Sequence, residues 1–113
     1  MSGLMVQMRP HVTIDEDGTW LPKDPVWGMY HDLDPEDQEE QKSLVMRNAF
    51  ACTHGEVAYE AWRDVPSTHV RTTVDRWVPP VYQDICVAHA KDAGVHLAVK
   101  VFHCGNSAHV RMK

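Results

Sequence analysis

The chain has 113 residues and a mass of 12.9 kDa, with 43% hydrophobic and 24% charged residues. These values are typical of one small globular domain covering 1–113, and they exclude a disordered chain or a disulfide-dense miniprotein. The net charge is −5, but residues 1–70 carry 5 basic and 13 acidic side chains whereas residues 71–113 carry 6 basic and 3 acidic ones. A predominantly acidic protein is not expected to bind nucleic acid over its whole surface.

Three cysteines, Cys52, Cys86 and Cys104, occur without a recognisable secretory leader. An odd number of cysteines in such a chain favours reduced thiols, and so an intracellular, cytoplasmic protein or one inside a virus particle. The sequence has no run of 18 apolar residues, so we expect no membrane-spanning segment.

The first predicted element is a β-hairpin, in which strands at 11–14 and 19–21 flank the turn Asp15-Glu16-Asp17-Gly18. Residues 22–34 then form a long loop rich in proline and aromatic residues. Trp27 and Tyr30 in this loop are candidate partner-binding residues, because aromatic rings supply rigid contact area.

The first helix is predicted to begin at Pro35, with Asp34 as its N-cap. Its first turns are acidic and should project into solvent, which makes them a second candidate partner-binding surface, formed by Glu36, Asp37, Glu39 and Glu40. Apolar residues between 44 and 52 predict that the same helix continues and that its second half is buried.

Two further segments have weaker signals. Thr53-His54-Gly55-Glu56 matches a capping box and predicts a short helix that carries apolar residues between 57 and 62. Residues 67–78 fit both a helical face and the alternation of a strand with β-branched residues. We favour a helix for 67–78.

The last third predicts a helix over 81–93 that ends at Gly94 and buries Val81, Ile85, Ala88 and His89. Alternating apolar residues at 95–101 predict a strand, and Gly105-Asn106-Ser107 predicts a turn into a second strand over 108–112. The expected fold class is therefore α+β: an N-terminal β-hairpin, a helical middle, and a helix followed by a C-terminal antiparallel β-hairpin.

Cysteine and histidine residues are crowded into the same region. Cys86 and His89 share one helical face, and Cys104 and His109 flank the predicted turn, so these four residues are the candidate ligands of a structural zinc ion. Asp84 and Asp92 are the nearby carboxylates that a metal-assisted hydrolase would use, but no His-Glu-x-x-His motif accompanies them. His103 cannot readily activate Cys104, because adjacent residues of a strand point to opposite faces.

No catalytic signature, nucleotide loop or nucleic-acid module is recognisable in the sequence. We therefore expect a non-enzymatic protein-interaction or structural subunit of a larger assembly, such as a viral particle component or a small inhibitor or adaptor, which binds a protein partner or its own copies without a cofactor. One alternative is a zinc-stabilised binding module that contacts nucleic acid through its basic C-terminal part. The other is a metal-assisted hydrolase.

Overall fold

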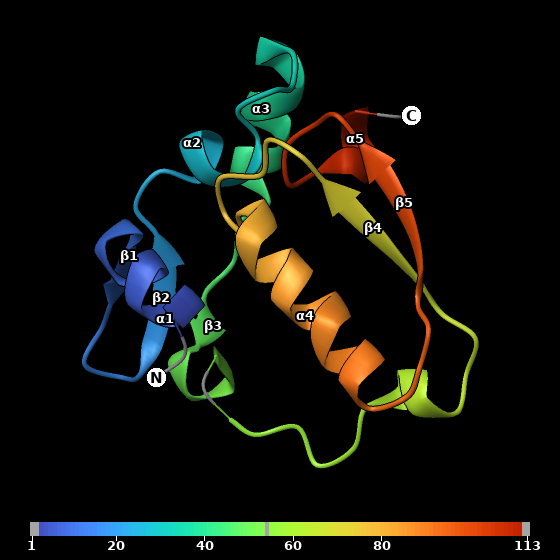
Figure 1. Cartoon of the computed structure of the whole chain (residues 1–113). Helices are drawn as coiled ribbons and strands as arrows, with labels where there is room; N and C mark the ends of the chain where they lie inside the picture. The colour runs from blue at the N-terminus through green and yellow to red at the C-terminus, as the bar shows by residue number, and fades with distance from the viewer. Residues whose placement is uncertain (1–2, 54, 112–113) are drawn as a thin grey trace.

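Helix α4 (Pro80–Asp92) crosses the middle of the molecule and separates two small sheets (Figure 1). The computed structural model describes residues 3–53 and 55–111. It confirms a mixed α+β chain with an antiparallel hairpin near its N-terminus. None of the helices in these two ranges has the length and apolar character that crossing a bilayer requires.

The N-terminal sheet follows α1 (Gly3–Met8) and the 3₁₀ helix η1 (Arg9–His11). Strands β1 (Val12–Ile14) and β2 (Thr19–Pro22) form the predicted antiparallel hairpin, and Gly18 at its turn adopts a φ of 81° that favours glycine. A third strand, β3 (Asn48–Ala49), pairs with β2. Arg47 precedes it and forms an ion pair with Asp15 across the turn.

The predicted first helix is half as long as expected. Helix α3 (Pro35–Ser43) begins at Pro35, but the side chain of Asp34 makes no capping hydrogen bond, and the helix ends before its apolar second half. The Ser43 hydroxyl donates to the Glu40 carbonyl at 2.6 Å, a bond that competes with helix continuation. Residues 48 and 49 join β2 instead, so the prediction of a helix to residue 52 is wrong.

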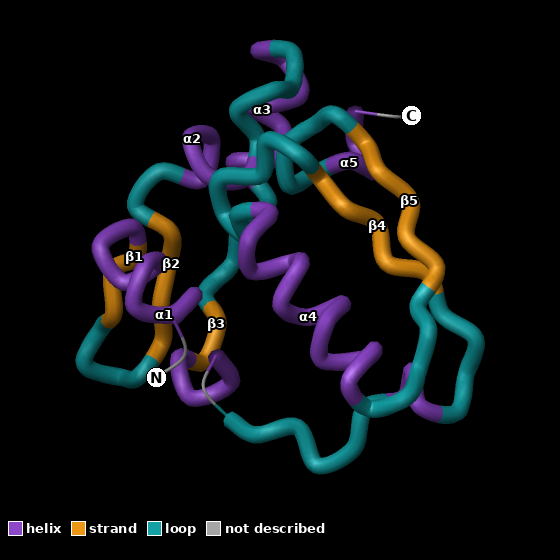
Figure 2. The backbone as a smooth tube through the Cα atoms, viewed as in Figure 1, coloured by secondary structure: helices purple, strands orange, loops and turns teal. Residues whose placement is uncertain are grey.

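The predicted short helix after Thr53 is also wrong. Residues Phe50–Thr53 form the 3₁₀ helix η2, residues 55–60 have no regular structure, and a single 3₁₀ turn, η3, covers Ala61–Arg63 (Figure 2). His54, which belongs to the predicted capping box, lies outside the described residues. The loop 22–34 contains one short helix that the sequence did not predict, α2 (Pro25–Met29).

The C-terminal half forms a β-α-β unit. Strand β4 (Thr68–Thr72) pairs in parallel with β5 (Ala98–Phe102), and α4 connects them. The prediction of a helix over 67–78 is wrong. The other pattern in this segment, the alternation of β-branched residues, corresponds to strand β4. The predicted C-terminal antiparallel hairpin is wrong as well: residues 108–111 form a short helix, α5 (Ala108–Arg111), and Met112 lies outside the described residues.

The position of helix α4 agrees with the predicted helix over 81–93. The helix ends before Gly94, which adopts a φ of 82° that favours glycine. Its buried face differs from the prediction: Gln83 and Ala90 are buried, whereas the four residues expected inside are exposed, namely Val81, Ile85, Ala88 and His89. The backbone of Val95 returns to Ala90 through a 3.0 Å hydrogen bond. The buried residues of the helix are therefore one polar residue, which contacts Thr72 of β4, and one small residue.

The hydrophobic core is thin. The buried apolar residues are Met5, Val12, Leu33, Ala90, Cys104 and Val110, and no large side chain in the described part of the chain is less than 2% exposed. The radius of gyration is 15.3 Å, compared with about 13 Å for a compact domain of this length. The accessible surface is 7651 Å², compared with about 6,300 Å² for a folded monomer of this mass.

Candidate functional site

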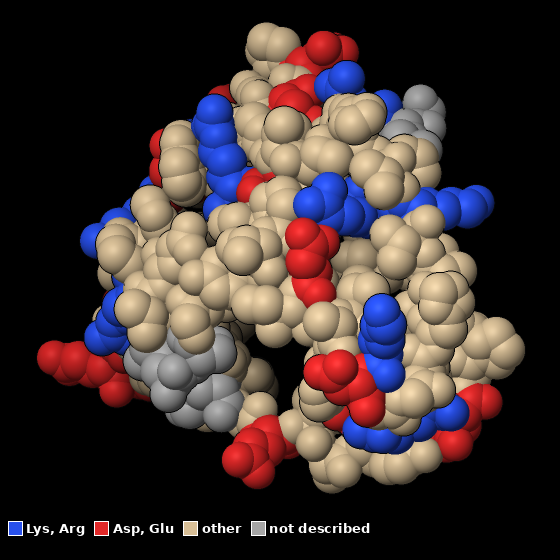
Figure 3. Space-filling view, in the orientation of Figure 1, with Lys and Arg blue, Asp and Glu red and all other residues tan. Residues whose placement is uncertain are grey.

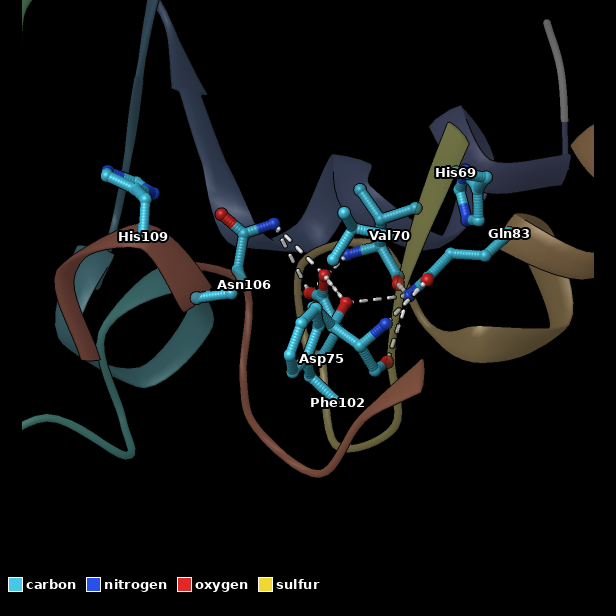
Figure 4. A pocket seen from close by; sticks show the side chains of 10 residues that line it. His69, Val70, Asp75, Gln83, Phe102, Asn106 and His109 are labelled. Carbon is cyan, nitrogen blue, oxygen red and sulfur yellow. Dashed lines mark hydrogen bonds between the residues drawn. The ribbon is translucent and has the colours of Figure 1, made fainter. Parts of the chain in front are cut away.

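At Thr72, the outer edge of β4 is closed by one side chain, Gln83 of α4, whereas the outward backbone of Val70 has no such partner in the described part of the chain. In the β4–β5 register, the backbone of Thr72 faces away from β5. The Gln83 amide accepts from the Thr72 N–H at 3.0 Å and donates to the Thr72 carbonyl at 3.1 Å. It also donates to the Val78 carbonyl at 2.8 Å (Figure 4). Gln83 thus meets the backbone of β4 as another strand would.

A buried carboxylate, Asp75, fixes the loop that follows β4. Its Oδ1 accepts from the N–H groups of Trp77 and Val78 at 2.9 and 2.8 Å. Its Oδ2 accepts from the Thr72 hydroxyl at 2.9 Å and from the Asn106 amide at 3.1 Å (Figure 4). These four bonds join the loops after β4 and β5, and a carboxylate so engaged is a structural element.

A largely apolar pocket of about 540 Å³ lies beside this network, a volume that suits a small ligand. Three of its polar residues, Asp75, Gln83 and Thr72, hydrogen-bond to one another or to nearby backbone. The Nε2 atom of His69 is buried and has no hydrogen-bond partner among the described residues. The pocket is lined by His69, Val70, Thr72, Asp75, Val78, Gln83, Phe102, Asn106, Ala108 and His109. Apolar side chains therefore form most of its surface.

The outer edge of β5 is open. The Ala98 N–H donates to the Ser67 carbonyl and the Thr73 N–H donates to the Phe102 carbonyl, which fixes the phase of the parallel ladder. In this phase the backbone groups of Val99 and Val101 point away from β4. Among the described residues, no third strand lies beside β5. The two-stranded sheet therefore presents unpaired donors and acceptors along Ala98–Phe102.

One face of β5 is also uncovered by α4. Paired residues of parallel strands share a face, so Val101 lies on the same face as Arg71. Arg71 forms an ion pair with Asp84 of α4 at 2.8 Å, which identifies this face as the α4 side. Val99 and Val101 are nevertheless 42% and 52% exposed. Helix α4 therefore covers β4 and leaves β5 open to solvent.

The four predicted zinc ligands do not come together. Within the described ranges, the structure contains no group of three or more His, Cys, Asp or Glu side chains placed to hold a metal ion. His89 Nε2 lies 3.2 Å from Glu60 Oε1, and its ring meets Trp62 edge to face. Cys86 and His109 are exposed, whereas Cys104 is buried. The pairing of helix and turn that motivated the zinc site depends on a hairpin that does not form.

Cys104 is a buried thiol at the end of the β-α-β unit. It is 3% exposed, and burial raises its pKa, with the Asp32 carboxylate adding to the effect. Asp32 Oδ2 accepts from the Gly105 N–H at 2.7 Å, and the Asp32 carbonyl accepts from the Arg111 guanidinium at 3.1 Å. These bonds attach the C-terminal segment to the link between α2 and α3, so Cys104 occupies a packed position unsuited to a thiolate nucleophile.

The aromatic candidates of the long loop differ from each other. Trp27 is 40% exposed, and its ring stacks on His11 with centroids 4.7 Å apart and lies under the Arg76 guanidinium. Tyr30 is half-buried, and its carbonyl accepts from the Gln38 side chain of α3. Trp27 therefore offers an exposed, preorganised ring, whereas Tyr30 contributes to the packing of the loop against α3.

The acidic helix start projects from the body of the molecule (Figure 1). Glu36, Glu39 and Glu40 are exposed, and Asp37 is half-buried. On the face drawn in Figure 3, basic side chains are scattered among acidic ones rather than gathered in a stripe. This distribution lacks the basic track along which a nucleic-acid backbone would run.

Comparisons with known proteins identify no relative: no protein-family model matches the chain, and neither a curated protein nor a solved structure is significantly similar to it.

The sequence did not indicate the roles of the three residues that distinguish the sheet edges. Gln83 is a polar residue inside an amphipathic pattern, and such a residue is normally assigned to the solvent side. Val99 and Val101 alternate as residues of a buried strand face do, yet they are exposed. The alternation of β-branched residues in 68–72 was the available signal, because a second strand before α4 implies a parallel crossover.

Proposed function

We propose that this protein is a non-enzymatic interaction subunit that works within a larger protein assembly. The observation that carries this proposal is the excess of accessible surface over that of a folded monomer, roughly 1,300 Å² by the usual scaling. One side of a standard protein–protein interface takes about 800 Å². The excess is thus large enough for one such interface.

The position of the exposed apolar residues supports the same proposal. A parallel sheet is normally covered on both faces, and a two-stranded sheet is marginal on its own. Here β5 has an open edge and exposed valines, and Val81 and Ile85 are exposed one turn apart on α4. A partner that covers these surfaces would supply the burial that the thin core lacks.

Native mass spectrometry of the full chain, purified gently without chelator, tests this proposal. We expect a complex of fixed stoichiometry, formed with a partner protein or with further copies of the chain. The same spectrum reports any bound metal by its mass. A chain that remains a monomer at every concentration, and that copurifies with nothing in fixed ratio, would overturn the proposal.

A further inference from the structure

We infer that the open edge of β5 binds an extended segment of a partner protein, which continues the parallel sheet and places an acidic side chain opposite Lys100. The inference rests on the proposed function and specifies its mode of recognition. Main-chain hydrogen bonds at a sheet edge supply affinity in this mode, and alternate side chains supply specificity.

The backbone supports strand addition at β5 and opposes it at Thr72 of β4. At Thr72, the outward N–H and carbonyl are both occupied by the Gln83 amide. At Val99 and Val101, the outward groups have no backbone partner in the described part of the chain. An extended segment can therefore pair with two successive outward-facing residues of β5.

The side chains of β5 define what that segment should contain. Val99 and Val101 lie on one face and are exposed, so the residues opposite them should be apolar. Lys100 lies between them on the other face, is exposed, and pairs with no carboxylate among the ion pairs of the described residues. An acidic residue opposite Lys100 would complete the match.

Lys100 also disfavours a second copy as the occupant in the register centred on it. In that two-fold antiparallel pairing of β5 with β5, Val99 would face Val101 and Lys100 would face Lys100. Like charges directly opposite each other destabilise a strand pair, and a lysine on an edge strand is a common means of preventing self-association. In this register, the charge at Lys100 therefore favours an acidic partner over the chain itself.

The test uses the ¹⁵N-labelled full chain and two blocked synthetic peptides at low salt: Thr-Val-Glu-Val-Thr, and the same peptide with lysine in place of glutamate. We expect chemical-shift changes centred on the amides of Val99 and Val101, and binding of the glutamate peptide about fivefold tighter than that of the lysine peptide. Equal affinities, or no shift at Val99 and Val101 at millimolar peptide, would overturn the inference.

Two variants separate charge from backbone recognition. Lys100→Glu should reverse the preference in favour of the lysine peptide. Val101→Pro removes an outward N–H but no ladder bond, so it should weaken both peptides, whereas the control Val101→Thr keeps that N–H and should bind like the wild type. An unchanged preference in Lys100→Glu contradicts the charge assignment even if Val101→Pro fails to fold.

The proposed function and this inference can fail separately. If the protein is a monomer that binds no partner, both the proposed function and the β5-edge inference are wrong. If it forms a homo-oligomer, the proposed function stands but the β5 edge is not the binding site. The same holds if it forms a heteromeric complex in which the β5 amides exchange their hydrogens as fast as in the isolated chain. Shift changes confined to the residues around the 540 Å³ pocket would likewise assign the peptide elsewhere.

Discussion

Thr72 at the outer edge of β4 and Val99 and Val101 at the outer edge of β5 meet their surroundings in opposite ways. At the β4 edge, a side chain that is 4% exposed satisfies the backbone of Thr72, and the Arg71–Asp84 ion pair adds a second link to α4. At the β5 edge, Val99 and Val101 keep their backbone and side chains in solvent. The Gln83 contact fixes the fold at Thr72, and the proposed binding site lies at the other edge of the sheet, so changes at one should leave the other largely intact.

The largest effect is expected from opening the closed edge. Gln83→Leu leaves the Thr72 N–H and carbonyl and the Val78 carbonyl without partners in a buried place, which should lower the free energy of unfolding by about 2–4 kcal/mol. Urea denaturation followed by circular dichroism measures this change. Val99→Thr at the open edge serves as the control, and a loss of similar size in that variant would contradict the distinction between the edges.

A smaller loss is expected from Thr72→Val, which removes one hydroxyl and preserves the shape of the side chain. That hydroxyl donates to Asp75 and accepts from Gln83, while both partners keep other hydrogen bonds. The free energy of unfolding should fall by about 1–2 kcal/mol. Thr68→Val, an exposed position on the same strand, should change it little; equal losses would mean that the hydroxyl network does not fasten the closed edge.

The ion pair between Arg71 and Asp84 should matter less than the buried amide. The Arg71 guanidinium lowers the pKa of the Asp84 carboxyl, but the pair is exposed to solvent and screened by salt. Asp84→Asn should therefore shift the urea midpoint far less than Gln83→Leu does. At high salt, Asp84→Asn should no longer shift the midpoint relative to the wild type. A shift that persists at 1 M salt would show that the carboxylate contributes by packing.

The smallest effect is a dependence on pH at the far end of α4. Hydrogen bonds from Arg63 and His89 lower the pKa of Glu60 from 4.5 to about 2. A lowered pKa contributes stability above pH 4.5, and that contribution is lost as pH falls towards 2. Glu60→Gln should therefore flatten the dependence of the urea midpoint on pH between 4.5 and 2. An unchanged slope in this variant would show that Glu60 titrates normally.

The sequence predicts the elements that local chemistry determines. The acidic turn ending in Gly18 gives the first hairpin, and Pro80 and Gly94 delimit α4, because turn geometry and helix ends depend on neighbouring residues. The start of α3 at Pro35 follows from the same local rules. These signals need no information from distant parts of the chain.

The remaining structure depends on contacts across the chain. Residues 48 and 49 leave the predicted helix to pair with β2, and 68–72 become a strand because β5 lies thirty residues further on, at 98–102. The zinc hypothesis depended on the wrong topology for the last segment. The choice of Trp27 as a candidate contact residue depended only on a local aromatic signal. Gln83 was unpredictable, since its role exists only when Thr72 turns its backbone towards α4.

The hydrogen bond from Gly105 to Asp32 joins residues 73 positions apart. The hairpin of β1 and β2 can form from neighbouring residues, but this bond and the pairing of β4 with β5 join residues far apart in the sequence. Non-local contacts form slowly because a long loop must close first. We therefore expect the antiparallel hairpin to form before the parallel sheet, which cannot assemble until residues 98–105 are available.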